Sequence, residues 1–227
     1  MIPRPANPLI AALDVSDLDR AEELARALSG GVGVLKVGLE LFAAHGPRAV
    51  ERIRAHGPVF LDLKLHDIPT TVERAARAVG RLGVSMLTVH ALGGQAMVAA
   101  AVRGVTEGSQ DAGHAVPTVL AVTVLSSLSG EELASPASLA FEARAAGAGG
   151  TVVSGQDVAL VREVTGEDFC LVVPGIRPAG SNGHDQVRIL TPEEAVDAGA
   201  DYLVVGRSIT ASADPAGAAR SILSTIR

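Results

Sequence analysis

Residues 59–82 read VFLDLKLHDIPTTVERAARAVGRL and contain the unit from which the fold is built. The stretch Val59–Lys64 is apolar at most positions, which is typical of a strand in a parallel sheet that is covered on both faces. A polar turn with a proline follows, and the Ala-, Arg- and Glu-rich stretch Thr71–Leu82 has the composition of a helix. The segment therefore predicts one strand followed by one helix.

The same unit recurs along the chain. Strands are predicted at Leu9–Asp14, Val32–Val37, Val59–Lys64, Met86–His90, Thr118–Thr123, Thr151–Ser154, Cys170–Val173 and Tyr202–Val205. Helices are predicted at Leu18–Leu28, Pro47–His56, Thr71–Leu82, Gln95–Thr106, Pro136–Ala146, Gln156–Val164, Pro192–Ala198 and Pro215–Ile226. Eight units of about 28 residues each predict an α/β fold, a single-domain (β/α)₈ barrel that spans residues 1–227. A doubly wound open sheet is the alternative, but the chain has neither a Gly-x-Gly-x-x-Gly turn after its first strand nor a P-loop.

The composition agrees with a globular α/β domain. The chain is 48% hydrophobic and 19% charged, with a formal net charge of −6, so it can bury a sizeable core. Because the balance is acidic and aromatic residues make up only 2% of the chain, we expect no nucleic-acid partner. Apolar runs stay below the roughly 18 residues of a membrane span. The first ten residues contain three prolines, so we expect neither a membrane partner nor a signal peptide.

Two residue types are rare enough to be informative. Cys170 is the single cysteine, which excludes an intrachain disulfide and a cysteine-based metal cluster and favours a cytoplasmic location. Lys36 and Lys64 are the only lysines among 19 Lys and Arg residues. Lysine can release a proton when its surroundings tune its pKa, whereas arginine cannot. The two lysines are therefore either chance survivors of an Arg-rich composition or candidates for chemistry.

Charged residues gather where the predicted strands end. Asp14, Lys36, Asp62 and Lys64 lie at the carboxyl ends of the first three strands, and Asp67 follows in the next loop. In a (β/α)₈ barrel the active site lies at that end. Asp62 and Lys64 are two residues apart on one strand, so we expect their side chains to leave the same face. A buried ion-pair network that closes the barrel is the alternative, although burying two neighbouring carboxylates is costly.

A second group of residues follows the last two predicted strands. Pro174-Gly175-Ile176-Arg177 follows the seventh strand, and Gly206-Arg207 follows the eighth and opens the last helical stretch. These loops are the usual phosphate site of this fold, and an Arg fork suits a phosphate dianion. The alternative for Arg177 and Arg207 is a solvated surface charge. The two groups together predict a phosphorylated small substrate at the barrel mouth.

Histidines give little support for a metal site. His66 and His90 lie near the charged residues and could join Asp62 and Asp67 as ligands. No His-x-His or His-Glu-x-x-His spacing supports that arrangement. We therefore expect no catalytic metal.

The run Phe60–Val72, FLDLKLHDIPTTV, resembles the signature of the orotidine 5'-phosphate decarboxylases. The resemblance covers essentially the whole chain, including residues 12–14 (ALD), 35–38 (LKVG), 88–90 (TVH), 123–127 (TVLSS), 174–178 (PGIRP), 185–186 (DQ) and 205–207 (VGR). The Asp-x-Lys-x-x-Asp core is shared with related barrel enzymes. The IPTT extension and the PGIRP loop are more specific and favour the bacterial branch of this family.

The resemblance implies a (β/α)₈ homodimer that converts orotidine 5'-phosphate to UMP and CO₂, the last step of UMP synthesis, without metal or cofactor. It implies that Lys64 donates a proton to C6 after CO₂ leaves and that Asp62 lies beside the substrate carboxylate. Lys36 and Asp67 would complete the charge array, with Asp67 reaching in from the partner subunit.

The resemblance also implies a set of substrate-binding residues. These are Asp14 and Lys36 at the ribose hydroxyls, Ile68 and Thr71 from the partner subunit, Ser126 or Ser127 at the pyrimidine edge, Gln186, Gly206 and Arg207 at the phosphate, and Pro174 and Arg177 in the closing loop. Ser126 stands where bacterial relatives often carry Thr, which also has a hydroxyl.

Two other functions remain open from the sequence. A sugar-phosphate enzyme of the same barrel group, a 3-keto-gulonate-6-phosphate decarboxylase or a hexulose-phosphate synthase, shares the Asp-x-Lys-x-x-Asp pattern but uses Mg²⁺. A non-catalytic sensor of phosphorylated ligands would bind a nucleotide and turn nothing over, although a pure binder has no need of a costly charge cluster. Metal dependence and turnover distinguish the three.

Overall fold

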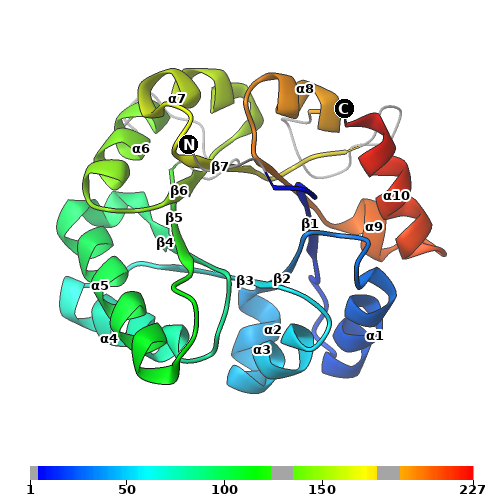
Figure 1. Cartoon of the computed structure of the whole chain (residues 1–227), viewed down its shortest axis with the longest axis horizontal. Coiled ribbons are helices and arrows are strands. Elements are labelled where there is room, and N and C mark those ends of the chain that lie inside the picture. Colours follow the sequence, from blue (N-terminus) through cyan, green and yellow to red (C-terminus); the bar gives the residue numbers. More distant parts are fainter. Residues whose placement is uncertain (1–4, 124–134, 178–189, 227) are drawn as a thin grey trace.

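Eight parallel strands pair in chain order and close into a barrel (Figure 1). The structure is a computed structural model, and it describes residues 5–123, 135–177 and 190–226. The strands are β1 (Leu9–Ala12), β2 (Val34–Gly38), β3 (Val59–Leu65), β4 (Met86–His90), β5 (Thr118–Val122), β6 (Gly150–Val152), β7 (Cys170–Val173) and β8 (Tyr202–Val205). The last strand, β8, pairs with β1 and closes the ring. The predicted (β/α)₈ barrel is confirmed.

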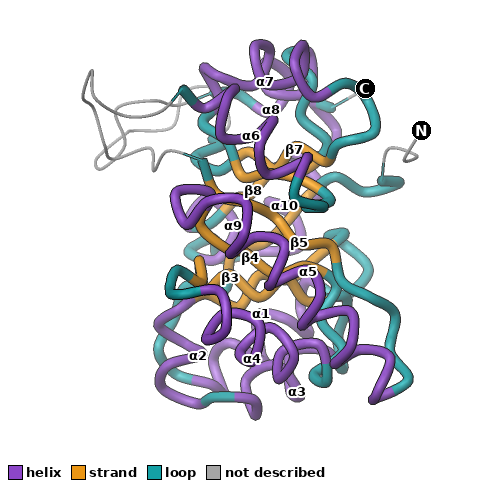
Figure 2. The backbone as a smooth tube through the Cα atoms, turned by 90° about the vertical axis from the view of Figure 1, so that its left-hand side faces the viewer, coloured by secondary structure: helices purple, strands orange, loops and turns teal. Residues whose placement is uncertain are grey.

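Helices surround the strands on the outside of the ring (Figures 1 and 2). They are α1 (Leu18–Leu28), α2 (Leu39–His45), α3 (Pro47–Arg54), α4 (Pro69–Gly80), α5 (Gly94–Ala112), α6 (Pro136–Ala145), α7 (Val158–Thr165), α8 (Pro192–Asp197), α9 (Arg207–Thr210) and α10 (Pro215–Thr225). Two short 3₁₀ helices, Ala91–Gly93 and Gly155–Asp157, precede α5 and α7. In the side view of Figure 2 the strands run through the centre of the molecule. None of the described helices is long and apolar enough to cross a membrane.

The strands have two buried faces, which explains why they are apolar at almost every position. Alternate residues of a strand point to opposite faces. One set of side chains packs outward against the helices in a large core. The other set fills the barrel as a smaller cluster, namely Ile10, Ala12, Val34, Phe60, Met86, Leu120, Cys170, Val172 and Val204. The inward positions therefore fix which later residues of each strand face the barrel mouth.

Three helical predictions need correction. The structure has a separate helix α2, which was not predicted, because Gly46 and Pro47 divide the helical region after β2 into two short helices. Gly206 and Arg207 do not open the last helix: Arg207 begins α9, and the last helix α10 starts at Pro215. The helix predicted to end at Thr106 continues to Ala112.

The longer course of α5 has a packing reason. Gly104 and Gly108 lie on α5 where it crosses α4, and a Cβ at either position would collide with the backbone carbonyl oxygen of Glu73 or Arg77. Glycine costs about 1 kcal/mol relative to alanine inside a helix. The close approach of the two helices offsets that cost, so local composition understates the length of the helix.

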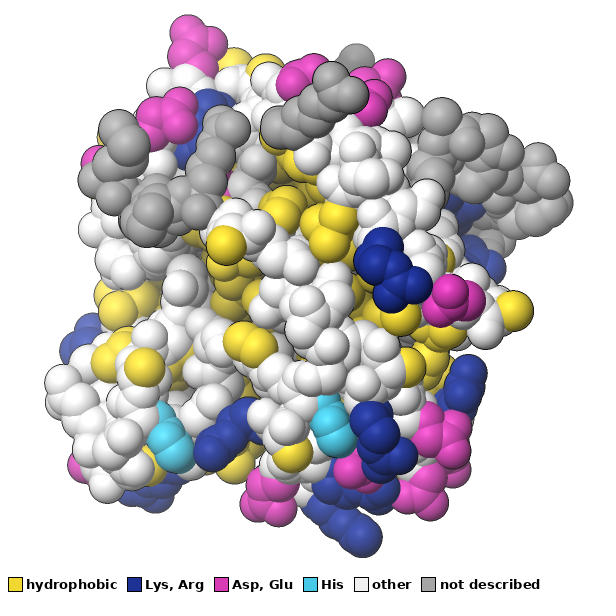
Figure 3. Space-filling model, turned by 45° about the vertical axis from the view of Figure 1, so that its right-hand side comes forward, with side chains coloured by type: hydrophobic (Ala, Val, Ile, Leu, Met, Phe, Trp, Pro, Cys, Tyr) yellow, Lys and Arg dark blue, Asp and Glu magenta, His cyan; other side chains and the backbone are white. Residues whose placement is uncertain are grey.

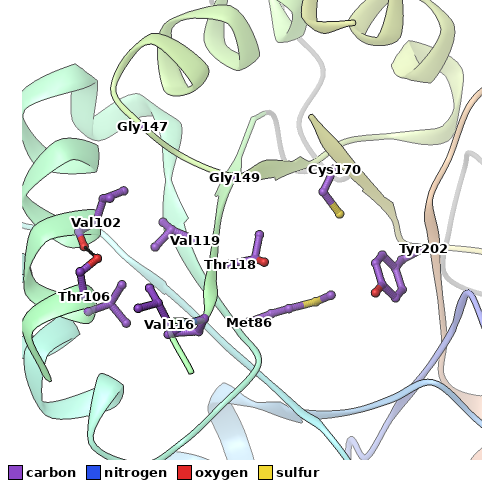
Figure 4. Close-up of a pocket in the computed structure, with 12 residues that line it drawn as sticks. Met86, Val102, Thr106, Val116, Thr118, Val119, Gly147, Gly149, Cys170 and Tyr202 are labelled. Atoms are coloured by element: carbon purple, nitrogen blue, oxygen red, sulfur yellow. Dashed lines mark hydrogen bonds between the residues drawn. The ribbon is translucent and has the colours of Figure 1, made fainter. Parts of the chain in front are cut away.

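A cavity of about 250 Å³ opens at the amino-terminal end of the barrel, away from the charged strand ends. Met86, Cys170 and Tyr202 project into it from three strands, and Val119 lines its other side (Figure 4). Its lining is mostly apolar, and it holds none of the predicted site residues. The chemistry expected from the sequence therefore belongs to the opposite end of the barrel.

Acidic and basic side chains lie intermixed on the face shown in Figure 3. Elsewhere in the described part of the chain, exposed ion pairs such as Arg20–Glu23 and Arg220–Asp214 also bring opposite charges together. Surface pairs of this kind each contribute about 0–1 kcal/mol to stability.

Candidate active site

Inward-facing positions bring four charged residues together at the carboxyl end of the barrel. The strand register pairs Ala12 with Lys36, and Gly38 with Asp62, so β1, β2 and β3 present these positions side by side. Asp14 follows β1, and Lys64 lies two residues beyond Asp62 on β3. The structure thus confirms the predicted meeting of Asp14, Lys36, Asp62 and Lys64.

These residues form a row of alternating charge. The Lys36 Nζ lies 2.8 Å from Asp14 Oδ1 and 3.6 Å from Asp62 Oδ2. The Lys64 Nζ donates to both oxygens of Asp62, at 2.8 Å to Oδ1 and 3.0 Å to Oδ2. The Thr88 hydroxyl donates to Asp62 Oδ1 at 2.9 Å. Two ammonium groups balance two carboxylates, so the row of four is close to neutral. We call these four residues the charge row.

Burial changes along the charge row. The side chains of Lys36 and Asp62 are 9% and 14% exposed, whereas those of Lys64 and Asp14 are 39% and 58% exposed. The buried centre excludes solvent, which strengthens electrostatic interactions there. A network that only closed the barrel would be buried throughout. Here one ammonium and one carboxylate remain open to a ligand.

The central carboxylate stays ionised. Burial by itself would raise the pKa of Asp62, but the charges of Lys36 and Lys64 outweigh it. Hydrogen bonds from Lys64 and Thr88 act in the same direction, so the pKa of Asp62 lies below its usual range. A negative charge is therefore fixed at the centre of the site at neutral pH.

The backbone path that brings Lys64 to Asp62 is not a regular strand. Leu61 pairs with Leu87, and the next pair is Leu65 with Val89. Four residues of β3 therefore lie opposite only two residues of β4, so the pairing is irregular between these points. Lys64 has φ +52°, the one positive φ of a non-glycine residue in the described part of the chain. The two side chains do meet, as predicted, but they do so through a bulge and not through simple alternation.

Two glycines adjoin the charge row, and one of them leaves space that a larger residue would fill. A Cβ on Gly38 would lie 3.2 Å from both Asp14 Oδ1 and Lys36 Nζ, which is tighter than most real contacts. A Cβ on Gly206 would lie 3.9 Å from Asp14 Oδ2. Gly206 is therefore next to the exposed end of the row. This links the residues after β8 with the charged residues after β1.

The two histidines near the charge row stack on each other. The rings of His66 and His90 lie 5.1 Å apart with an interplanar angle of 21°. Burial, followed by the charges of His66 and Lys64, lowers the pKa of His90. In the described ranges, no group of three or more His, Cys, Asp or Glu side chains is arranged to hold a metal ion.

The residues expected to reach a partner subunit point to solvent in the single chain. Asp67, Ile68 and Thr71 are all exposed, and Ile68 is 66% exposed although it is large and apolar. The Asp67 carboxylate accepts a hydrogen bond from the Ile68 N–H at 2.6 Å. In this chain these side chains are not part of the charge row.

The residues predicted to bind phosphate lie after β7 and β8. Pro174 and Arg177 are partly buried, and the Arg177 N–H donates to the Leu190 carbonyl at 3.1 Å. Arg207 is exposed at the first position of α9, beside Gly206. Ser126, Ser127 and Gln186, together with most of the predicted closing loop, lie outside the described residues.

Comparison with known proteins places the chain in a family. A family model described as "Orotidine 5'-phosphate decarboxylase / HUMPS family" matches residues 7–222. The chain belongs to this family. A relative named orotidine 5'-phosphate decarboxylase from Anaeromyxobacter sp. (strain K) is 52% identical over 96% of this chain and 98% of its own. Another of that name from Moorella thermoacetica is 48% identical over 97% of this chain and 92% of its own.

Solved structures agree with the family assignment. The crystal structure of orotidine 5'-phosphate decarboxylase from Lactobacillus acidophilus has a TM-score of 0.83 and 37% identity. It covers 96% of this chain and 98% of its own. The enzyme of the same name from Pyrococcus horikoshii OT3 has a TM-score of 0.78 and 26% identity. The resemblance read from the sequence is thereby confirmed.

One residue of this family member was not singled out from the sequence. Thr88 is completely buried on β4, yet its hydroxyl contacts both Asp62 and the Lys64 backbone. It lies at an inward position two residues after Met86 and two before His90. The sequence feature that could have identified Thr88 is a hydroxyl at an inward position near the carboxyl end of a barrel strand.

Proposed function

We propose that this protein decarboxylates orotidine 5'-phosphate to UMP and CO₂. The charge row carries the proposal, because its exposed ammonium, Lys64, stands at the barrel mouth beside the buried, ionised Asp62. Membership of the family and the names of the relatives at about half identity support the same reaction.

The chemistry requires an ammonium at the position of Lys64. Loss of CO₂ from C6 of the pyrimidine leaves a carbanion that has no π-system into which it can delocalise. A fixed positive charge beside that carbon stabilises the developing negative charge. The same ammonium can then transfer its proton to C6 and complete the product. An arginine could supply the charge but not the proton.

Asp62 has two proposed roles in this reaction. Its two oxygens accept hydrogen bonds from the Lys64 ammonium and hold that group in place. It also lies where the substrate carboxylate would approach Lys64, so the two negative charges would repel each other until CO₂ departs. Lys36 holds Asp62 from the opposite side at 3.6 Å and keeps its orientation.

Substrate binding is proposed to use the residues around the charge row. Asp14 and Lys36 would meet the ribose hydroxyls, and Ser126 or Ser127 the pyrimidine edge. Gly206 and Arg207, with Gln186, would hold the phosphate. The position of Gly206 beside Asp14 supports a phosphate close to the ribose end of the row. Pro174 and Arg177 begin the loop that would close over the substrate, with phosphate binding energy driving closure.

We also propose a homodimer with shared active sites. Asp67, Ile68 and Thr71 would contribute to the site of the other subunit, and this contact would cover Ile68, a large apolar side chain that is 66% exposed in the single chain. Asp67 would add a carboxylate to the row from outside. The proposed reaction uses no metal and no cofactor, and the proposed compartment is the reducing cytoplasm.

The test is conversion of orotidine 5'-phosphate in the presence of EDTA, followed by the ultraviolet change as orotate becomes uracil. We expect rapid conversion by the native protein and none by Lys64→Ala. Arg220→Ala removes an exposed basic side chain that pairs with Asp214 and is not part of the row, so this variant should convert substrate at the native rate. Folded native protein that leaves the substrate unchanged would overturn the proposal. Mg²⁺-dependent turnover of a sugar phosphate would then assign the alternative function.

Shared sites have a separate test. Lys64→Ala and Asp67→Ala homodimers should both be inactive. In a mixed dimer one site receives both substitutions and the other receives neither, so random mixing should restore about a quarter of the native activity. Verified mixed dimers without activity would contradict the sharing of sites and leave the decarboxylation itself intact.

A further inference from the structure

A buried hydroxyl connects the two catalytic candidates of β3. Thr88 has no exposed surface, and a buried hydroxyl needs hydrogen-bond partners. Its Oγ1 accepts from the Lys64 backbone N–H at 2.9 Å and donates to Asp62 Oδ1 at 2.9 Å. One oxygen thus contacts the backbone of the proposed proton donor and the carboxylate beside it.

The partner on the backbone is in an unusual position. Lys64 adopts a left-handed conformation within the bulge of β3, where the regular pairing with β4 is interrupted. L-residues rarely hold this conformation unless surrounding contacts fix it. The Thr88 hydroxyl supplies such a contact at the residue itself. Without it, a backbone N–H inside the site would lose its acceptor.

The partner on the side chain is fixed as well. The hydroxyl holds Asp62 Oδ1, and Lys36 faces the other oxygen at 3.6 Å. The carboxylate is therefore held from both sides and cannot rotate freely to follow the Lys64 ammonium. Fixed donors and charges of this kind reduce the reorganisation that a reaction requires.

We propose that Thr88 is a positioning residue for the decarboxylation. It holds the Lys64 backbone and the Asp62 carboxylate in a mutual arrangement that directs the ammonium toward the barrel mouth. This inference rests on the proposed function. Because Thr88 has no exposed surface, it acts through Lys64 and Asp62.

The choice of variants separates the hydroxyl from the packing. Thr88→Val keeps the shape and removes the hydroxyl, whereas Thr88→Ser keeps the hydroxyl and removes a methyl group. Thr151→Val is the matched control, because Thr151 is equally buried and its hydroxyl donates to a backbone carbonyl, that of Ala121, away from the charge row. Thr88→Ala provides a second hydroxyl-free variant should the valine variant not fold.

The kinetic expectation is a change in kcat. We expect Thr88→Val to lower kcat about 10- to 100-fold, with KM within about threefold of the native value, because the reacting group is misplaced while most binding contacts remain. Thr88→Ser should recover kcat to within about threefold of native. Thr151→Val should keep the native kcat even where its melting temperature falls. A merely structural role would lower the stability of both valine variants and leave kcat per folded molecule unchanged.

The pH profile gives an independent readout. The charged and titratable groups around Asp62 are Lys36 on β2, Lys64 on β3, His90 on β4 with His66 stacked on it, and Asp14 beyond Lys36. Thr88→Val keeps all these groups and removes only the hydroxyl that donates to the Asp62 carboxylate. A change in the pH profile of this variant therefore reports the loss of that hydrogen bond. A donor favours the charged form, and its removal should raise the pKa of Asp62. The acid limb of kcat/KM should therefore move to higher pH in Thr88→Val and return in Thr88→Ser.

The outcomes distinguish this inference from the proposed function. Native protein that turns over orotidine 5'-phosphate, with Thr88→Val and Thr88→Ala retaining kcat within about threefold, would overturn the positioning role alone. Native protein without turnover would overturn the function. In that case crystal structures still decide whether Thr88 positions the two groups: a displaced Lys64 backbone and Asp62 carboxylate in Thr88→Val would support this, and an unchanged arrangement would refute it.

Discussion

The left-handed backbone of Lys64 predicts that glycine at this position makes the protein more stable than alanine does, which is the reverse of the usual order. Lys64→Ala and Lys64→Gly both remove the ammonium, so both should lack turnover. They differ only in the Cβ. At φ +52° a Cβ lies close to the following carbonyl oxygen, which costs about 1–2 kcal/mol. In an ordinary strand position glycine is instead less stable than alanine by about 0.5–1 kcal/mol, because the unfolded chain is more flexible.

The two contributions oppose each other at position 64. Subtracting the flexibility cost from the relief of strain leaves Lys64→Gly more stable than Lys64→Ala by about 0–1.5 kcal/mol. Thr118 begins β5 at a partly exposed position without a positive φ and serves as the reference. There Thr118→Gly should be less stable than Thr118→Ala by about 0.5–1 kcal/mol.

Urea unfolding followed by circular dichroism measures the four free energies of unfolding. A difference of 1 kcal/mol corresponds to about 2–4 °C in Tm for a chain of this size, so thermal unfolding provides a second measurement. Glycine that destabilises position 64 as much as position 118 would refute the strain at Lys64. The bulge of β3 would then be an unstrained feature.

Two further predictions concern groups outside the charge row. Burial raises the pKa of the Cys170 thiol to about 12, so iodoacetamide at pH 8 should alkylate it far more slowly in the folded protein than in urea. Equal rates by mass spectrometry would contradict its burial. The Arg162 side chain is 11% exposed, and its guanidinium donates to Asp201 Oδ2 at 2.7 Å and to three backbone carbonyl groups. Arg162→Met leaves these acceptors without their donor and should lower the free energy of unfolding by about 3–5 kcal/mol. Arg220→Met, at an exposed pair, should cost less than about 1 kcal/mol, and equal losses in urea unfolding would show that the Arg162 contacts contribute little.

Much of the fold could be predicted because every strand of the barrel has the same surroundings. Each strand is buried on both faces, so each appears as a short apolar run, and β4, β7 and β8 have the predicted bounds. Helix bounds were less predictable. The separate helix α2 buries one residue, Leu41, and therefore has almost no apolar periodicity to detect. The extension of α5 depends on glycines whose benefit comes from contact with α4.

The charge row was predictable for a different reason. Charged residues stand out at the end of apolar runs, and strand ends meet at one mouth of a barrel. The bulge in β3 was not predictable, because residues 61–65 alternate regularly between apolar and charged side chains while their pairing with β4 is irregular. Thr88 was missed because threonine is common in strands, and only its contacts distinguish it from a packing residue.

The site can be understood as the last layers of the barrel interior. Steps of two residues lead from Ile10 to Ala12 and Asp14 after β1, from Val34 to Lys36 and Gly38 on β2, and from Met86 to Thr88 and His90 on β4. On β3 such a step leads from Phe60 to Asp62, and the bulge then brings Lys64 to the same side. The first layer is apolar and packed, the second holds the buried Lys36 and Asp62, and the third includes the more exposed Asp14 and Lys64. Because the second layer is neutral in charge and hydrogen-bonded, its burial is tolerable. The packed layer beneath it makes the charges rigid, and rigidity is the property that electrostatic stabilisation of a transition state requires.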